Sequence, residues 1–87
     1  MKCAIYAVKD ELNEEFMNPM FVQENGHSED VARRNFATNV NEIPIWRSNP
    51  SDWSLYKLGE FESTTGIFTS CKPDKIVGGR AVLKEEI

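Results

Sequence analysis

The chain has 87 residues, of which 40% are hydrophobic and 28% are charged, and its formal net charge is −4 at pH 7. This composition is typical of one soluble globular domain and excludes a disordered or fibrous segment. Chains this short bury only about 60% of their unfolded surface, so pairing of two copies into a homodimer is an open possibility. The negative charge repels polyphosphate, and nucleic-acid binding would therefore require a local basic patch.

The N-terminal part of the chain is predicted to form two strands. Residues 2–9 mix β-branched and aromatic side chains in an imperfect alternation, which indicates a strand with at least one buried face. Residues 10–18 are acidic and lack a clean period, so we expect an exposed loop with at most one helical turn. A second, short strand is expected over residues 20–23, because the turn-forming pair Asn25-Gly26 follows it.

One amphipathic helix is predicted from Ser28 to about residue 41. Ser28 is a suitable N-cap, and the two acids after it place negative charge at the partly positive N-terminus of the helix. Ala32, Phe36 and Val40 recur every four residues and form an apolar stripe that can lie across a sheet. Pro44 cannot continue the helix, so we expect residues 43–49 to form a connector.

A β-hairpin is predicted in the second half of the chain, beginning after the turn-rich residues 49–52. Strict alternation along its first strand divides the side chains between two faces, with Leu55, Lys57, Gly59 and Phe61 on one and Tyr56, Leu58 and Glu60 on the other. Gly66 allows a left-handed turn, after which residues 67–71 return antiparallel.

Pro73 is expected to end this hairpin, and residues 76–77 with 81–83 are expected to add one more ragged strand. The tail beyond Lys84 is expected to fray. The predicted fold is therefore a single α+β domain over residues 1–87, roughly β-β-α-β-β, with one helix packed on a small antiparallel sheet.

No motif in the chain predicts catalysis, a metal site or a cofactor. His27 is interpreted as a solvated surface residue, and Cys3 and Cys71 as small buried thiols in a reducing cytoplasm, since neither has metal-ligand spacing. The apolar run near the N-terminus is far shorter than a membrane span of about 20 residues, so we expect no membrane association. An enzyme is accordingly not expected.

The residues worth weighing for binding combine aromatic rings with basic groups. Proteins that bind single strands use such residues to stack bases on the rings and to contact phosphates with the basic groups. The candidates are Arg33, Arg34, Trp46, Arg47, Trp53, Tyr56 and Lys57. The alternative is structural: Phe36, Phe61 and Phe68 occupy expected core positions. The two arginines of the helix also each follow an acid by four residues, at Glu29 and Asp30, which favours pairing within the helix.

The order of several segments resembles that of a known family. They are Pro19-Met20-Phe21, the helical Ala32-Arg33-Arg34-Asn35-Phe36, and Asn49-Pro50-Ser51-Asp52-Trp53-Ser54 continuing into Leu55-Tyr56-Lys57-Leu58-Gly59-Glu60-Phe61, with Thr65-Gly66 after it. Together they resemble the small nonstructural protein of microviruses, especially the gokushovirus group of single-stranded DNA phages. The resemblance covers residues 5–77, and residues 55–61 are its most specific part.

Members of that family are commonly labelled DNA-binding. The resemblance therefore implies a phage nonstructural protein that binds single-stranded DNA and assists genome replication or packaging in the cytoplasm of a bacterial host. The rival hypothesis is a protein–protein interaction module that contacts a host or phage protein through a sheet edge or an apolar patch around Trp46 and Trp53. The residues themselves leave both hypotheses open.

Overall fold

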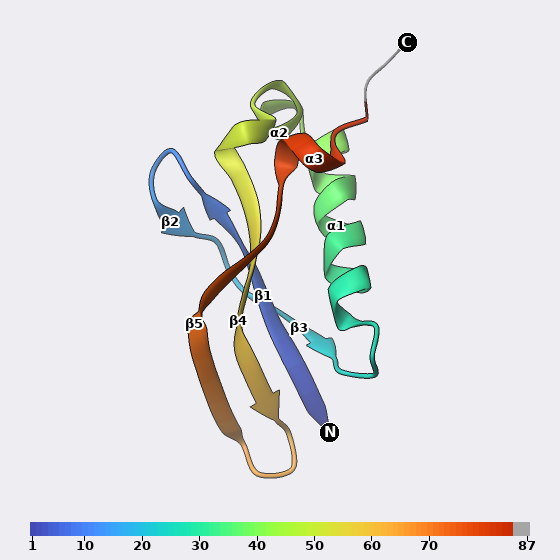
Figure 1. The fold of residues 1–87 in the computed structure, drawn as a ribbon, viewed down its shortest axis with the longest axis vertical. Coiled ribbons are helices and arrows are strands. Elements are labelled where there is room, and N and C mark those ends of the chain that lie inside the picture. The colour runs from blue at the N-terminus through green and yellow to red at the C-terminus, as the bar shows by residue number, and fades with distance from the viewer. Residues whose placement is uncertain (85–87) are drawn as a thin grey trace.

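The computed structural model describes residues 1–84 and has an α+β fold (Figure 1). The elements are β1 (Lys2–Asp10), β2 (Glu15–Phe16), β3 (Met20–Gln23), α1 (Ser28–Glu42), α2 (Pro44–Ser48), the 3₁₀ turn η1 (Pro50–Asp52), β4 (Trp53–Glu62), β5 (Ile67–Gly78) and α3 (Gly79–Val82). The predicted α+β class, with an amphipathic helix packed on an antiparallel sheet, is confirmed, but the structure has further helices besides the predicted one. The predicted fraying of the tail concerns residues 85–87, which lie outside the described residues.

All strands belong to one antiparallel sheet with β1 in its interior. The strand order is β2-β1-β4-β5, and β3 also pairs with β1. Since β4 runs along one edge of β1 from Lys2 to Asp10, β2 and β3 occupy successive parts of its other edge. β5 is thus an edge strand, paired among the described residues only with β4.

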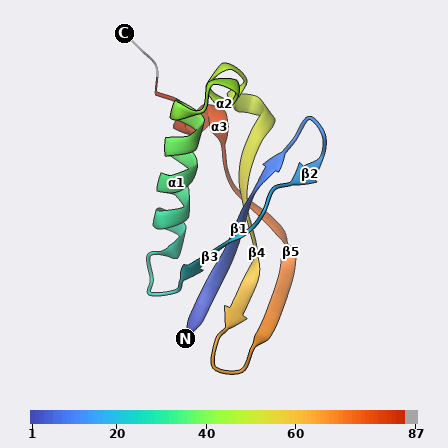
Figure 2. The ribbon, with the colours of Figure 1, turned by 180° about the vertical axis from the view of Figure 1, so that it is seen from behind.

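The core lies between α1 and one face of the sheet. The predicted apolar stripe of α1, Ala32, Phe36 and Val40, is fully buried. It meets a matching set of side chains on the sheet, namely Ala4, Tyr6, Val8 and Leu55. Figures 1 and 2 show α1 lying along one side of the sheet, whereas the β1–β2 hairpin projects on the other side. Within residues 1–84, one face of the sheet is therefore covered by a helix, and the other is not.

The first turn of α1 differs from the prediction. Ser28 is the first helical residue rather than the N-cap, which is His27, and none of the described side chains caps this helix end. The Ser28 hydroxyl is buried and turned inward, 3.0 Å from the hydroxyl of Tyr6, and it donates a 2.8 Å hydrogen bond to the Glu24 carboxylate. This bond is the main cause of a lowered pKa at Glu24. Ser28 thereby ties the helix to β1 and to the loop before the helix.

The expected connector after α1 is a second helix. Pro44 does end α1, but it also opens α2, because proline suits the first position of a helix. The Trp46 ring in α2 is only 5% exposed and stacks on the Trp53 ring at 4.6 Å between centroids. A stacking role for Trp46 would need an exposed ring, whereas α2 folds this side chain into the core.

The loop expected over residues 10–18 is partly a hairpin. β1 continues to Asp10, and β2 returns beside it, so the expected helical turn is absent from this described segment. The Asp10 carboxylate accepts hydrogen bonds from the backbone N–H groups of Leu12 and Asn13 and from the Asn13 amide. These bonds lower the pKa of Asp10, and they hold the turn by the short side-chain contacts typical of Asp.

The hairpin of β4 and β5 is present but longer than predicted. Pro73 does not end it: β5 continues to Gly78, and residues 79–82 form α3 rather than a further strand. Proline is tolerated here because β5 is an edge strand and its register shifts between the partners of Lys57 and Gly59. The prediction of Phe68 as a core residue is also wrong, because its side chain is 63% exposed.

A bulge at Leu58 reverses the alternation of β4. In the pairing with β1, Tyr6 lies opposite Lys57 but the preceding Ile5 lies opposite Gly59, so Leu58 is the extra residue. Directly opposite residues share a face. The helix-covered face therefore receives Leu55, Lys57 and Glu60, and the other face receives Tyr56, Gly59 and Phe61. The predicted division is wrong from Gly59 onward.

Candidate functional site

The predicted binding residues do not form one site. Trp46 and Trp53 come together, but they do so as part of the core at the end of the sheet near α2. Tyr56 lies on the helix-free face, because it pairs with Ala7 of β1, whereas its neighbour Lys57 points to the helix side. These side chains therefore cannot act together on one ligand.

The three predicted arginines lie on the helices, and Arg33 and Arg47 contact other groups of the protein. Arg33 forms an ion pair with Glu29 at 3.2 Å, as predicted, and donates to the carbonyl oxygen of Ile76 at 3.4 Å. Arg47 donates to the carbonyl oxygen of Asn41 at 3.5 Å. Arg34 is exposed beside a shallow hollow, and within the described residues its predicted ion pair with Asp30 is not formed.

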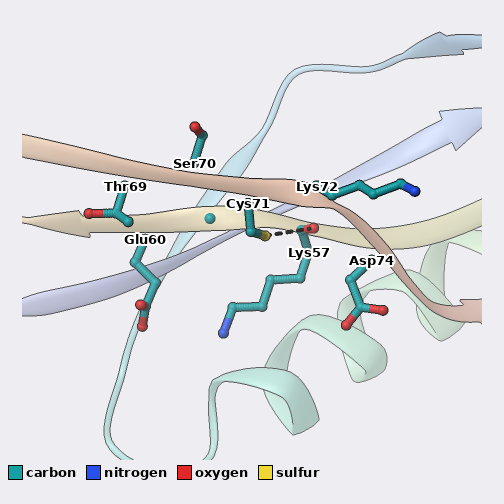
Figure 3. Close-up of a pocket in the computed structure, with 8 residues that line it drawn as sticks. Lys57, Glu60, Thr69, Ser70, Cys71, Lys72 and Asp74 are labelled. Atoms are coloured by element: carbon teal, nitrogen blue, oxygen red, sulfur yellow. Dashed lines mark hydrogen bonds between the residues drawn. The ribbon is translucent and has the colours of Figure 1, made fainter.

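Lys57 lines a cavity of about 450 Å³ at the bulge between β4 and β5 (Figure 3). Figure 3 shows Lys57, Glu60 and Asp74 on the same side of the two strands. Cys71 is exposed rather than buried as predicted, and its thiol lies 3.7 Å from the carbonyl oxygen of Lys57. The cavity thus carries charges of both signs on an edge strand, which favours no single class of ligand.

The helix-free face carries the most distinctive surface, here named the aromatic face. It consists of Phe16, Phe21, Tyr56, Phe61 and Phe68. These residues pair with β1 between Cys3 and Lys9. At the usual rise per residue of a strand, the face is about 20 Å long.

The rings of the aromatic face form two groups. Phe16 and Tyr56 meet edge to face at 5.3 Å between centroids. Phe21, Phe61 and Phe68 form the second group, with centroid separations of 5.8 Å, 6.1 Å and 4.7 Å. Phe16, Phe21 and Phe68 are 36%, 50% and 63% exposed. Each group therefore presents ring surface to solvent instead of closing on itself.

Charge on this face differs from that of the whole chain. The Lys9 ammonium lies 5.6 Å from the centroid of Phe16 and 5.7 Å from that of Tyr56, a favourable cation–π geometry. Lys75 lies opposite Tyr56 on β5, whereas the acids Glu60 and Glu62 belong to the helix side by their pairing with Ala4 and Lys2. Two lysines therefore lie on this face while these two acids lie on the other, although the Glu11 carboxylate also lies beside both lysines.

Two features could have revealed the aromatic face from the sequence. Phe61 and Phe68 are placed symmetrically about the hairpin turn and face each other directly. Phe21 alternates with Met20 and Val22, which pack against the core, so it belongs to the opposite face of β3. Phe16 had no such signal, because its position depends on the β1–β2 pairing.

Within residues 1–84, no group of three potential ligands is arranged to hold a metal ion. None of the described helices is long and apolar enough to cross a membrane. No curated protein and no solved structure shows significant similarity to the chain. A family model described as "Phage ORF5 protein" matches residues 3–82, which is nearly the whole chain. The chain belongs to this family of phage proteins.

Proposed function

We propose that the protein binds single-stranded DNA on its aromatic face. On this proposal it is a nonstructural protein of a microvirus that assists genome replication or packaging in the host cytoplasm. The supporting observation is the pair of exposed ring groups with lysines beside them on a helix-free sheet face. Bases of any sequence can stack on such rings, while lysines contact the phosphates. Membership of a phage family and the resemblance to microvirus proteins agree with this role.

The net charge of −4 does not exclude this function, because the local field matters at the contact. Glu60 and Glu62 are kept on the opposite side of β4 from the aromatic face. Binding is expected to be weak and to depend on salt, since two lysines supply few phosphate contacts. The stacking energy of the rings would then carry much of the affinity.

Fluorescence anisotropy of a labelled oligothymidine at low salt tests the proposal. Phe68→Ala should weaken binding by about 5-fold to about 150-fold, because stacking contributes about 1–3 kcal/mol per base. The matched control is Ile45→Ala, which removes an equally exposed apolar side chain from α2 (62% exposed against 63%). Equal affinity of both variants, or no binding by the wild type at high concentration, would contradict the proposal. Anisotropy is preferred to tryptophan quenching because Trp46 is buried.

A second candidate is an interaction module, on which the same face contacts a protein, either a host or phage partner or a second copy in a homodimer. Exposed Phe68 on this face, beside the outer edge of β5 that pairs with no other described strand, favours it, because apolar patches and free strand edges often mark protein contacts. Sedimentation measurements on the wild type and on Phe68→Ala distinguish the two. A dimer lost in the variant, together with no binding of oligothymidine, would favour this candidate.

A further inference from the structure

One carboxylate lies among the basic groups at the Phe16–Tyr56 end of the aromatic face. Glu11 Oε1 is 3.4 Å from Lys9 Nζ, and Glu11 Oε2 is 4.0 Å from Lys75 Nζ. The hydroxyl of Tyr56 donates a 3.2 Å hydrogen bond to Glu11 Oε2. Donors from three neighbouring strands, β1, β4 and β5, therefore converge on a single anionic group.

The backbone holds this carboxylate in place. The Glu11 N–H donates a 2.7 Å hydrogen bond to the carbonyl oxygen of Asp52, which anchors the end of β1 beside the start of β4. The side chains of Glu11 and Lys9 are only 28% and 25% exposed. Desolvation is the larger cause of the raised pKa of Tyr56, and contact with Glu11 raises this pKa further. Tyr56 therefore remains a hydrogen-bond donor at neutral pH.

We propose that Lys9, Tyr56 and Lys75 form a phosphate-binding subsite that Glu11 fills in the unliganded chain. Phosphate oxygens accept hydrogen bonds from ammonium and phenol groups as carboxylate oxygens do. The subsite itself does not depend on the proposed function, but its natural ligand does. On that function the ligand is a phosphate of single-stranded DNA beside a base stacked on Phe16 or Tyr56. Glu11 then acts as an internal competitor, and it weakens DNA binding at this end of the face.

Inorganic phosphate tests the subsite without DNA. In Glu11→Gln, phosphate titrated at low ionic strength should shift the NMR signals of Lys9, Tyr56 and Lys75. The control Glu15→Gln removes the same charge from an exposed residue whose partner, Asp10, lies on the helix side, and it should show no such shifts. Adding Lys9→Gln to Glu11→Gln should abolish them. Thermal melting of each variant shows that it is folded.

Oligothymidine supplies the second readout. Glu11→Gln should bind about fivefold more tightly than Glu15→Gln, the factor that corresponds to about 1 kcal/mol for a partly exposed charge contact. Its logarithmic salt slope should be steeper by about 0.7 for each phosphate contact that Glu11 no longer opposes. Phosphate shifts in Glu11→Gln without DNA binding by any variant would support the subsite and refute the proposed function. Identical behaviour of Glu11→Gln and Glu15→Gln toward phosphate would overturn the subsite.

Discussion

Replacement of Gly59 by alanine tests whether the bulge in β4 decides the composition of both sheet faces. Gly59 has a φ of +154°, and a Cβ at this position would clash with the carbonyl oxygen of Thr69 on β5. The backbone region is nearly restricted to glycine, and holding another residue there costs about 1–3 kcal/mol. Relief of the clash must also separate β4 from β5. We therefore expect Gly59→Ala to lower the free energy of unfolding by about 3 kcal/mol.

Urea denaturation followed by circular dichroism measures this loss. With a slope of about 1 kcal/mol/M, expected for a small domain, the midpoint should fall by about 3 M. Gly66→Ala is the matched control, because Gly66 also has a positive φ of +74° but a Cβ there would meet nothing within 4 Å. The free energy of unfolding of Gly66→Ala should fall by only about 1–2 kcal/mol, which is the cost of a left-handed backbone for a residue with a side chain.

The position of Phe61 gives an independent readout of the same reasoning. Its ring lies 5.8 Å from that of Phe21, a contact that exists only because the bulge returns Phe61 to the helix-free face. NMR contacts between the two rings should weaken in Gly59→Ala and persist in Gly66→Ala. Equal midpoints for the two variants, with the ring contacts intact in both, would refute the reasoning.

Three further outcomes follow from single side chains. Phe36→Ala should lower the free energy of unfolding by about 3–5 kcal/mol in urea titrations, because a fully buried ring is removed; a loss below 1 kcal/mol would be inconsistent with the core described. NMR titration should give Glu24 a pKa below its ordinary 4.5, and this pKa should rise in Ser28→Ala. The stability that this carboxylate contributes is present above its unfolded pKa and is lost as the pH falls through its folded pKa. An unchanged Glu24 pKa in the variant would contradict the hydrogen bond. Spectrophotometric titration should place the pKa of Tyr56 above 10, and this pKa should lie closer to 10 in Glu11→Gln. The stability linked to the raised pKa is lost as the pH rises above 10 through the folded pKa. A Tyr56 pKa at or below 10 would exclude this environment.

Local patterns in the sequence were sufficient for the helix and for the hairpin. Ala32, Phe36 and Val40 share one side of any helix that includes them, so their burial requires only a sheet to pack against. The turn at Gly66 lies between two strand-forming segments, and chain connectivity alone brings them together. These features depend on neighbours a few residues away, which explains why the fold class was predicted correctly.

The candidate site depends on contacts between distant segments. The bulge at Leu58 arises where β4 must match both β1 and β5, and a one-residue shift moves every later side chain to the other face. Trp46 was a candidate for binding because nothing in its own segment indicates that α2 folds back onto Trp53. The sequence by itself determined the fold class and the amphipathic helix. Only the tertiary structure decided which aromatic rings reach solvent, because strand register is set by pairing across the whole sheet.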